Sequence, residues 1–451
     1  MTASHRPPDI HDGGAPGSVP AVMSVWGRLR RIESEGRPAQ VAVVGAGYVG
    51  QGLVHRLERT PGLRAALVVN RTVSAGVEAY ERVGHDRRHI VVSDEPGELV
   101  TAIDGFRPAV TSAAEILPAL KEIDVVVEAT GAIDHGATVM LACLEAGQDL
   151  VSINAEVDAT IGHLLHHVAK EGDAVYTISD GDQPGGLLRQ IELAEGMGFD
   201  VVAAVNCKRH LDVRQTPATS AAFAKRDGTS LAVTTSAGDG TKMQIECAVV
   251  ANVAGLLPDR RGMHGVPTTL EHALSDVLAA VSRRGVVEHT LGGDFGAGVF
   301  VIAHAPEHDL VQRPLRFFKM GDGPDYLFFR PNTLVQFEMP ITIAEVVLDR
   351  QALGVPSGPP VAEVVAIAKR DLVAGEALDG IGGFTCYGQI DTVDGAAGLL
   401  PIALAGHARL RVPVPQDQPV SLDSIELDEE APIVALRRRQ DQLLGRAPVG
   451  A

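Results

Sequence analysis

Residues 40–71 read QVAVVGAGYVGQGLVHRLERTPGLRAALVVNR, and this stretch decides the fold. The run from Val41 to Val44 is short and apolar, as expected of a strand that is buried on both faces. Three glycines follow it at the spacing G-x-G-x-x-G. An amphipathic stretch comes next, and a second apolar run extends from Ala66 to Val69. The sequence therefore predicts a strand, a tight turn, a helix and a second strand.

The three glycines, Gly45, Gly47 and Gly50, each have a physical task in such a unit. The first allows the tight turn, the second lets the backbone approach a pyrophosphate, and the third lets the helix pack on the strand. The helix N-terminus, which contains Tyr48 and Val49, offers free N–H groups to the phosphates. Because the strands and the helix surround the motif in the required order, we expect a dinucleotide-binding turn. A glycine-rich turn in an unrelated α/β domain is the alternative.

The end of the second strand bears on the choice of cofactor. NAD sites usually place Asp or Glu there for the ribose 2′-hydroxyl, whereas NADP sites avoid that charge and supply an Arg for the 2′-phosphate. This chain has Asn70 and Arg71 at that position. The sequence therefore favours NADP(H), with NAD as a possible substitute. The alternative for Arg71 is an ordinary solvated loop residue.

Further apolar runs alternate with helical patterns up to about Asn154. This alternation predicts an α/β fold with a Rossmann-type parallel sheet and right-handed crossovers. Ligands bind beyond the carboxyl ends of such strands. We therefore expect Thr130, Gly131 and Asn154 beside the nicotinamide, together with Glu156.

The composition excludes several functional classes. The net charge of −18 argues against nucleic acid and anionic membranes as partners. The 4 cysteines are widely spaced and form no C-x-x-C pair, so we expect neither a zinc cluster nor disulfides. No apolar run approaches the roughly 18–20 residues of a membrane span, and the N-terminus lacks the apolar core of a secretory signal. These observations predict a cytoplasmic protein.

Changes in composition along the chain predict its domain organisation. The segments PSGPP and MTASHRPPDIHDGGAPGSVP are typical of a linker and of a disordered tail. Two related phrases, AKRDLVAGEALDGI and VPVPQDQPVSLDSI, suggest a pseudo-symmetric small β fold. The predicted parts are a tail and helix at 1–36, a Rossmann domain at 37–160, an α+β catalytic and dimerisation domain at 161–354, a small β-rich domain at 361–430, and a C-terminal helix and tail at 431–451.

Six stretches together resemble a known family. They read VAVVGAGYVGQGL, VVVEATG, YTISDGDQPGG, DGTKMQIECAVVANVAGL, PDRRGMHG and AKRDLVAGEALDGIGGFTCYG. They resemble the 1-deoxy-D-xylulose 5-phosphate reductoisomerase-like oxidoreductases, and the resemblance covers most of the chain after residue 37. It implies a homoserine-dehydrogenase-like NAD(P) domain, a C-terminal SAF domain, and a role for some members in isoprenoid biosynthesis. The sequence departs from the family in one loop, where Arg209 and Val213 replace the usual glycine and proline.

Four residues are the candidates for catalysis. A carbonyl reductase needs a proton donor or positive group on the carbonyl oxygen and a proton relay. Lys208 and Lys242 are the candidates for the first task, and the alternative for each is a solvated surface lysine. Glu246, four residues after Lys242, shares a face with it, which suggests a reactive couple or an ordinary salt bridge. Asp182 is a candidate for acid–base work or for capping a helix.

Other polar residues are candidates for binding the substrate. Asp180 lies in the same tight loop as Asp182, and its alternative is a turn residue. Arginine can hold a phosphate or carboxylate bidentately, and for any one arginine surface solvation is the alternative. The arginine candidates are Arg209, Arg214, Arg260 and Arg261. His264 could relay protons or be structural, and the sequence leaves a Mg²⁺ or Mn²⁺ site open.

Taken together, the sequence predicts an NADP(H)-dependent oxidoreductase that acts on a small, polar, phosphorylated or acidic carbonyl or hydroxy compound. We expect a homodimer. One alternative is a homoserine-dehydrogenase-like enzyme that acts on an unphosphorylated aldehyde. Another is an NADP-binding sensor in which the SAF-like domain binds a partner without turnover.

Overall fold

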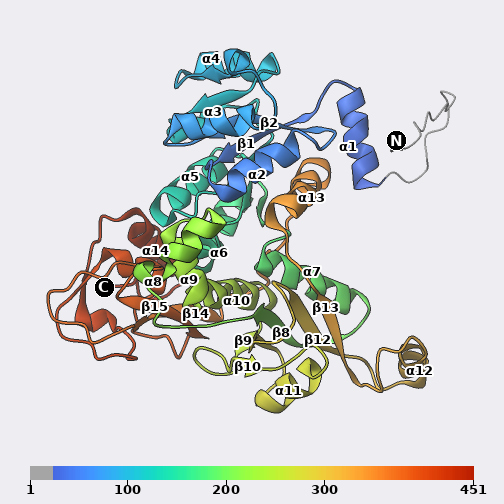
Figure 1. Cartoon of the computed structure of the whole chain (residues 1–451), viewed down its shortest axis with the longest axis vertical. Coiled ribbons are helices and arrows are strands. Elements are labelled where there is room, and N and C mark those ends of the chain that lie inside the picture. The colour runs from blue at the N-terminus through green and yellow to red at the C-terminus, as the bar shows by residue number, and fades with distance from the viewer. Residues whose placement is uncertain (1–23, 451) are drawn as a thin grey trace, which may run out of the picture.

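The computed structural model describes residues 24–450 (Figure 1). The tail predicted for the first 20 residues lies outside this range. Two large sheets and a smaller C-terminal β-rich part follow one another along the chain. None of the described helices combines the length and the apolar composition needed to cross a bilayer.

The first sheet contains seven strands, all of which pair in parallel, and this confirms the predicted Rossmann-type α/β fold. Its strand order is β3-β4-β2-β1-β5-β6-β7. The strands are β1 (Ala39–Val44), β2 (Leu63–Val69), β3 (Val91–Val92), β4 (Ala109–Thr111), β5 (Val125–Glu128), β6 (Asp149–Ser152) and β7 (Tyr176–Ile178). The order reverses between β1 and β5, and such a switch point is where doubly wound sheets bind ligands.

Helices on both faces of this sheet bury its apolar strands. They are α1 (Val25–Ser34), α2 (Tyr48–Leu57), α3 (Val73–Glu81), η1 (Arg87–His89), α4 (Pro96–Asp104), η2 (Ala114–Ala119), α5 (Ile133–Glu145) and α6 (Ala155–Glu171). Val41 and Val43 belong to a different core cluster from Ala42 and Val44, so β1 is buried on both faces. The uninterrupted apolar run in the sequence has this double burial as its cause.

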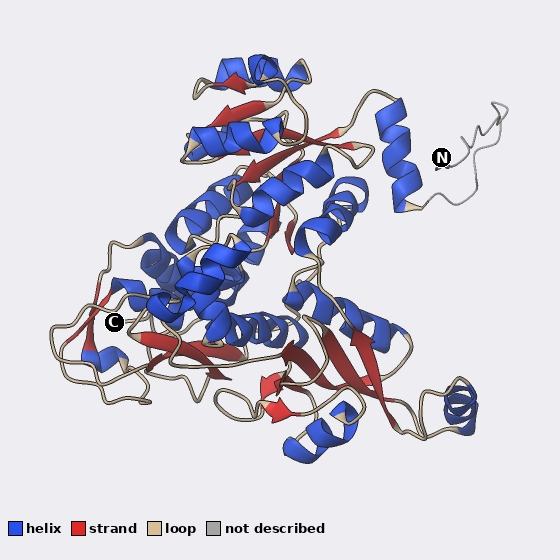
Figure 2. Cartoon of the chain, viewed as in Figure 1, coloured by secondary structure: helices blue, strands red, loops and turns tan. Residues whose placement is uncertain are grey.

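The second sheet is mixed and has six strands. Its order is β10-β11-β8-β12-β13, and β9 also pairs with β11. The strands are β8 (Asp200–Lys208), β9 (Leu257–Pro258), β10 (Val266–Pro267), β11 (Val286–Leu291), β12 (Val299–His304) and β13 (Asp325–Arg330). The helices of this part are α7 (Gln183–Gly196), α8 (Pro217–Asp227), α9 (Leu231–Gly238), α10 (Thr241–Ala254), α11 (Ala273–Ala280), α12 (Asp309–Phe317) and α13 (Val335–Asp349). Helices α7 and α10 lie between the two sheets (Figure 2).

The C-terminal part packs short strands against α10 and α14. It contains β14 (Ala362–Ala368), β15 (Cys386–Thr392), η3 (Ile402–His407), β16 (Ala408–Leu410), η4 (Leu422–Ser424), β17 (Ile425–Leu427) and α14 (Pro432–Leu443). The two related phrases lie side by side, since Leu372 bridges to Val414 and the backbone of Ala368 exchanges hydrogen bonds with Asp417 and Gln418. This adjacency agrees with the pseudo-symmetry suggested by the sequence.

The first sheet extends beyond residue 160, where the sequence placed a domain boundary. Helix α6 returns the chain to the sheet edge, and β7 pairs in parallel with β6. Conversely, α13 comes from the region after the second sheet but packs on α2 of the Rossmann part. Its side chains Met339 and Ile343 are fully buried in the core of that part. The chain therefore passes between the part built on the first sheet and the part built on the second sheet more than once. A division of the sequence into consecutive domains could not show this.

Candidate functional site

The turn after β1 has the geometry that a dinucleotide requires. Gly45 has φ +103°, and a Cβ on it would lie 2.9 Å from the carbonyl oxygen of Ala129. A Cβ on Gly50 would lie 1.9 Å from the carbonyl oxygen of Gly45, so only glycine allows α2 to start here. Gly47, at the N-cap of α2, faces open space. A phosphate group can therefore approach the backbone at Gly47 and the free N–H groups of the helix.

A cavity of about 500 Å³ lies next to this turn, and we call it the cofactor cavity. It is lined by Gly45, Gly47, Val69, Asn70, Arg71, Thr72, Ser112, Ala129, Thr130, Ala132 and His135. Asn70 shapes the turn, because its Oδ1 accepts from the N–H of Ala46 (2.9 Å) and its Nδ2 donates to the carbonyl of Thr72 (2.8 Å). The exposed Arg71 is the cation at the place where a 2′-phosphate would sit. Of the other two predicted residues, Tyr48 is exposed and Val49 is half-buried.

A buried carboxyl group, that of Glu128, directly precedes the cavity-lining residues Ala129 and Thr130. Glu128 ends β5 and accepts hydrogen bonds from the backbone N–H and the hydroxyl of Thr130. Burial raises the pKa of Glu128 to about 7. Asn154 caps α6, since its Oδ1 accepts from the N–H of Val157 (3.2 Å). The predicted residues Thr130, Gly131 and Asn154 therefore do lie at neighbouring strand ends.

The second group of site residues centres on Lys242. This lysine stands in the first turn of α10, where a positive charge opposes the helix dipole. Its Nζ lies 3.3 Å from Oε1 of Glu246, one turn later. Burial on its own would lower the pKa of Lys242. The carboxylates of Asp182, Glu246 and Glu156 outweigh that effect and raise the pKa above its ordinary value.

The partners of Lys242 are themselves perturbed. Burial raises the pKa of Glu246 to about 7, against the lowering effect of Lys242. Lys208, at the end of β8, donates to the carbonyl of Ala237, and burial lowers its pKa. The charges of Lys208, Lys242 and Glu246 each influence the pKa of another member of this group, so three of the four residues predicted for catalysis belong to one cluster. Asp182 is the fourth, and its carboxylate raises the pKa of Lys242.

Two further residues of this cluster were missed by the sequence analysis. Asn206 precedes Lys208 by two positions on β8, and its Nδ2 donates to Glu246 (3.1 Å) and to Gln183 (3.2 Å). His289 is its cross-strand neighbour on β11. Both are almost completely buried, yet Oδ1 of Asn206 and both ring nitrogens of His289 have no hydrogen-bond partner. Burial lowers the pKa of His289 to about 4, so the ring is neutral at pH 7.

A signal for Asn206 was present in the sequence, because a polar residue in an apolar β run is unusual. His289 gave no comparable signal, since it lies in VVEHTL beside another polar residue. Only the pairing of β11 with β8 places it beside the site.

Asp182 and Asp180 have different environments despite their spacing. Asp182 occupies the N-cap position of α7 but makes no capping hydrogen bond, so its carboxylate is free to face Lys242. Asp180 is buried and paired with Arg330 (2.9 Å) and Arg189 (3.2 Å). The prediction that Asp180 binds substrate is therefore replaced by a structural role, because two arginines already occupy its oxygens.

The predicted arginines do not gather around Lys242. Arg214 pairs with Asp417 (2.5 Å) and donates to the carbonyl of Lys369 (2.9 Å). Arg260 donates to the carbonyl of Met263 (3.0 Å). Arg209 is exposed at the end of β8.

Two other predicted side chains have partners outside the Lys242 cluster. Arg261 pairs with Asp391 (2.6 Å) in the C-terminal part. His264 bonds to Asp259 (2.7 Å). Three of the four predicted arginines therefore have partners elsewhere, and they do not form a phosphate-binding group beside Lys242.

The C-terminal part fixes the start of α10. Lys369 pairs with Asp239 (2.8 Å), one residue before the N-cap of the helix. The backbone of β15 donates to Thr241 (2.8 Å, from Gly388) and to Gln244 (2.9 Å, from Ile390). Because Lys242 stands between these two anchors, the C-terminal part holds it in position. Within residues 24–450, no group of three His, Cys, Asp or Glu side chains is arranged to hold a metal ion.

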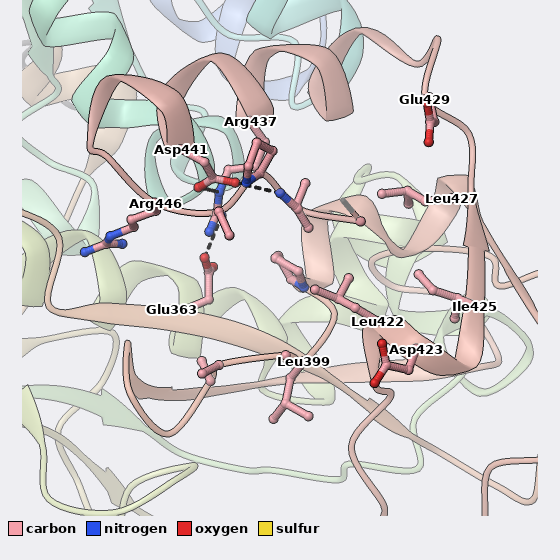
Figure 3. Close-up of a pocket in the computed structure, with 18 of the residues that line it drawn as sticks. Glu363, Leu399, Leu422, Asp423, Ile425, Leu427, Glu429, Arg437, Asp441 and Arg446 are labelled. Carbon is pink, nitrogen blue, oxygen red and sulfur yellow. Dashed lines mark hydrogen bonds and ion pairs between the residues drawn. The ribbon is translucent and has the colours of Figure 1, made fainter.

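A larger cavity, of about 830 Å³, lies away from these residues between α14 and the C-terminal strands (Figure 3). Arg437 on α14 pairs with Glu363 (2.5 Å) and Asp441 (2.9 Å) at one side of it. The carboxylates raise the pKa of Arg437 against the effect of burial. Both carboxylates also accept backbone N–H groups, from Val364 and Val449. This cluster therefore serves to tie α14 to β14.

Comparison with known proteins supports part of the predicted resemblance. Residues 181–339 match the family model described as the catalytic domain of oxidoreductase DRL. No curated protein matches the sequence. The matched range contains Asp182, Lys208, Lys242 and Glu246. The general prediction of an oxidoreductase is thus confirmed for the catalytic part, whereas deoxyxylulose phosphate chemistry stays a prediction.

Several solved structures have a similar arrangement at low identity. A myo-inositol dehydrogenase from Corynebacterium glutamicum is 12 % identical, with a TM-score of 0.39 over 70 % of this chain and 90 % of that one. GenD2 from gentamicin A biosynthesis, in complex with NAD, is 15 % identical, with a TM-score of 0.37 over 72 % and 89 %. A DOX-P reductoisomerase with fosmidomycin and magnesium is 14 % identical, with a TM-score of 0.34 over 47 % and 56 %. At this distance, substrate and mechanism have to be inferred from the residues of this chain, of which the central 181–339 are similar to an oxidoreductase catalytic domain.

Proposed function

We propose that this protein is an NADP(H)-dependent oxidoreductase that interconverts a carbonyl and a hydroxyl group of a small polar compound. The observation that carries the proposal is the position of Lys242. Its ammonium is held by carboxylates at the start of α10, next to the strand ends where a nicotinamide would lie. Asn154 and Asp182 line one small cavity, which links the two groups of residues.

The residues of the turn after β1 fit a dinucleotide. Gly47 leaves room for the pyrophosphate, the start of α2 offers N–H groups, and Arg71 provides the cation for a 2′-phosphate. When bound, the nicotinamide supplies or accepts the hydride at the carbonyl carbon.

The chain's own residues handle the proton. Lys242 donates a hydrogen bond and then a proton to the carbonyl oxygen during reduction, so that hydride and proton together form the alcohol. Glu246, whose pKa is about 7, returns a proton to Lys242. Asn206 donates to Glu246 and holds its carboxylate in place. In the oxidation direction the same groups remove the proton.

The first experiment is an assay of NADPH oxidation with the purified full chain. The substrate tested first is 1-deoxy-D-xylulose 5-phosphate, which the sequence resemblance implies, with and without Mg²⁺ or Mn²⁺. NADH runs in parallel, as does homoserine with NADP⁺. Arg71→Gln should weaken NADPH binding about 10–100-fold, the value of a charge-assisted hydrogen bond, and leave NADH binding unchanged. Arg59→Gln, on the exposed loop after α2, is the matched control.

Substrate-dependent oxidation of NADPH that Lys242→Met abolishes would support the proposal. Tight NADPH binding without turnover of any carbonyl compound would favour the sensor alternative. An equal loss of NADH and NADPH binding in Arg71→Gln would show that the arginine does not select the 2′-phosphate.

A further inference from the structure

Another cavity, of about 330 Å³, lies on the other side of residues 129–135 from the cofactor cavity, and we call it the side cavity. Thr130 and Ala132 line the cofactor cavity, whereas Gly131 and Ile133 line the side cavity. One segment therefore forms the wall between them. A nicotinamide at the ends of β5 and β6 would sit at this wall.

The side cavity also adjoins the Lys242 cluster. Ser236 lines the cavity, and the carbonyl of the next residue, Ala237, accepts a hydrogen bond from Lys208 of this cluster. Glu156 also lines the cavity, and its carboxylate contributes to the raised pKa of Lys242. A compound in the side cavity would thus lie beside the nicotinamide end of the cofactor site and next to residues that contact or act on the Lys242 cluster. Its volume lies at the lower end of the roughly 300–1,000 Å³ range of ligand pockets, which suits a small molecule.

Three parts of the chain build the walls. Besides the Rossmann segment, α9 contributes Val233 and Ser236, and the C-terminal part contributes Ile381 and His407. The loop of the C-terminal part comes very close to α9, since a Cβ on Gly382 would lie 2.2 Å from the carbonyl oxygen of Ala232. The side cavity is therefore incomplete without the C-terminal part.

The charges in the side cavity disfavour an anion. Of the described residues that line it, none is Lys or Arg, and two are the carboxylates Asp134 and Glu156. The imidazole of His407 is already paired with Asp134 (2.9 Å). A phosphate here would lose its hydration and gain no cation of the cavity wall in return. The remaining lining side chains are apolar or small, with Ile133, Val233 and Ile381 the largest.

We propose that the side cavity seats the substrate and that the seated part carries no anionic group. The substrate class is a small hydroxy or oxo compound without phosphate, whose apolar flank faces Val233 and Ile381. The assignment of the reacting carbonyl rests on the proposed function, whereas the selection by charge rests on the cavity alone.

Two matched pairs of probes test this proposal: 1-deoxy-D-xylulose and D-erythrose, each against its terminal phosphate ester. Binding to the NADPH-loaded full chain is followed by the change in NADPH fluorescence, and turnover by NADPH oxidation. We expect the neutral member of at least one pair to bind at least tenfold more tightly than its ester.

Val233→Lys adds a cation to the cavity at a side chain that is already 45 % exposed. We expect it to reverse the preference in favour of the ester. Leu231→Lys, on the same helix with the same 45 % exposure but outside the cavity lining, should leave the preference unchanged. Ile381→Arg repeats the test from the C-terminal wall, with Val373→Arg, which is exposed and outside the lining, as its control.

The two proposals fail in different ways. Selective binding of the neutral member without NADPH oxidation would support the side cavity and remove the redox proposal. Oxidation of NADPH by the phosphate ester at equal or lower concentration than by the neutral compound would overturn the side cavity and keep the redox proposal. Absence of neutral-probe binding, or equal behaviour of Val233→Lys and Leu231→Lys, would also overturn it.

Discussion

Two buried ionic clusters in this protein differ in how completely their polar atoms are paired. Around Arg437, the carboxylates of Glu363 and Asp441 each pair with the guanidinium and accept a backbone N–H. Nη1 of Arg437 is the one buried polar atom of these three side chains that makes no hydrogen bond, and it lies 2.5 Å from Oε2 of Glu363. Around Lys242, the neighbouring Asn206 and His289 are as deeply buried but keep three polar atoms without a partner. A group buried without a partner is expensive, and structures retain it mainly where a ligand supplies the missing bond. From this comparison we infer that the larger number of unpaired buried atoms, more than burial or charge, marks the Lys242 cluster as the functional one.

The largest expected effect that tests this comparison is the loss of activity in Lys242→Met. We expect kcat for carbonyl reduction to fall by about 10²–10⁴-fold, the range for a positioned proton donor. The free energy of unfolding should also fall, because the buried Glu246 loses its cation, although the substitution removes a charge that opposes the dipole of α10. Kinetics and thermal melting measure the two effects. Lys225→Met, an exposed lysine on α8, is the control, and unfolding of the Lys242 variant alone would assign a structural role to this lysine.

Arg437→Met should show the opposite behaviour. Two carboxylates would be left buried without their cation, and we expect the free energy of unfolding to fall by about 3–5 kcal/mol. The kcat of the protein that remains folded should stay within about twofold of the wild type, because the cluster does not touch the proposed active site. Chemical denaturation and initial rates measure both. A variant that keeps its stability but loses activity would erase the distinction between the clusters.

His289→Leu gives a smaller but more diagnostic effect. Removing two unpaired buried ring nitrogens should raise the free energy of unfolding by about 1–2 kcal/mol, while substrate turnover falls. His264→Leu is the matched control, because its ring is bonded to Asp259 (2.7 Å) and its loss should lower stability. Equal destabilisation by both substitutions would place His289 among the structural residues.

The smallest effect is a pH dependence set by Glu246. Its pKa is raised to about 7, so the carboxyl is protonated below that value and ionised above it. The rate of carbonyl reduction, which consumes a proton, should fall as the pH rises through 7, by up to about tenfold per unit. Folding stability should fall in the same direction between the ordinary pKa of 4.5 and pH 7, since only the folded state binds the proton there.

Glu246→Gln should flatten both profiles near pH 7. Glu128 also has a pKa of about 7, and Glu128→Gln is therefore the control that separates the two carboxyls. A rate profile that changes only in Glu128→Gln would move the titrating group from the Lys242 cluster to the cofactor cavity.

Much of the fold could be predicted because local pattern and tertiary burial agree in the Rossmann part. The apolar run at β1 is uninterrupted since both of its faces are covered, and the three glycines stand where a side chain would collide or would fill the phosphate position. Lys242 and Glu246 could be paired from their spacing, because one helical turn brings them 3.3 Å apart.

Some residues that the sequence suggested as substrate ligands are instead paired with other side chains of the protein. Their partners are distant in the sequence. Asp180 looked like a ligand residue, but Arg330 reaches it from 150 residues away. Arg214 looked like a phosphate ligand, but Asp417 of the C-terminal part pairs with it. Short-range pattern carries no information about such pairs.

The sequence by itself determined the dinucleotide turn, the parallel sheet and the Lys242–Glu246 pair, because each has a local pattern: a glycine motif, an alternation of strands with helices, and a spacing of one helical turn. The tertiary structure alone decided which charges are free. The pairing of β11 with β8 brings His289 beside Asn206, and the packing of the C-terminal loop on α9 closes the side cavity. These contacts join residues 83 and 150 positions apart, and they form only when these segments bury their surfaces together. The final distinction between structural and functional charges therefore belongs to the folded chain.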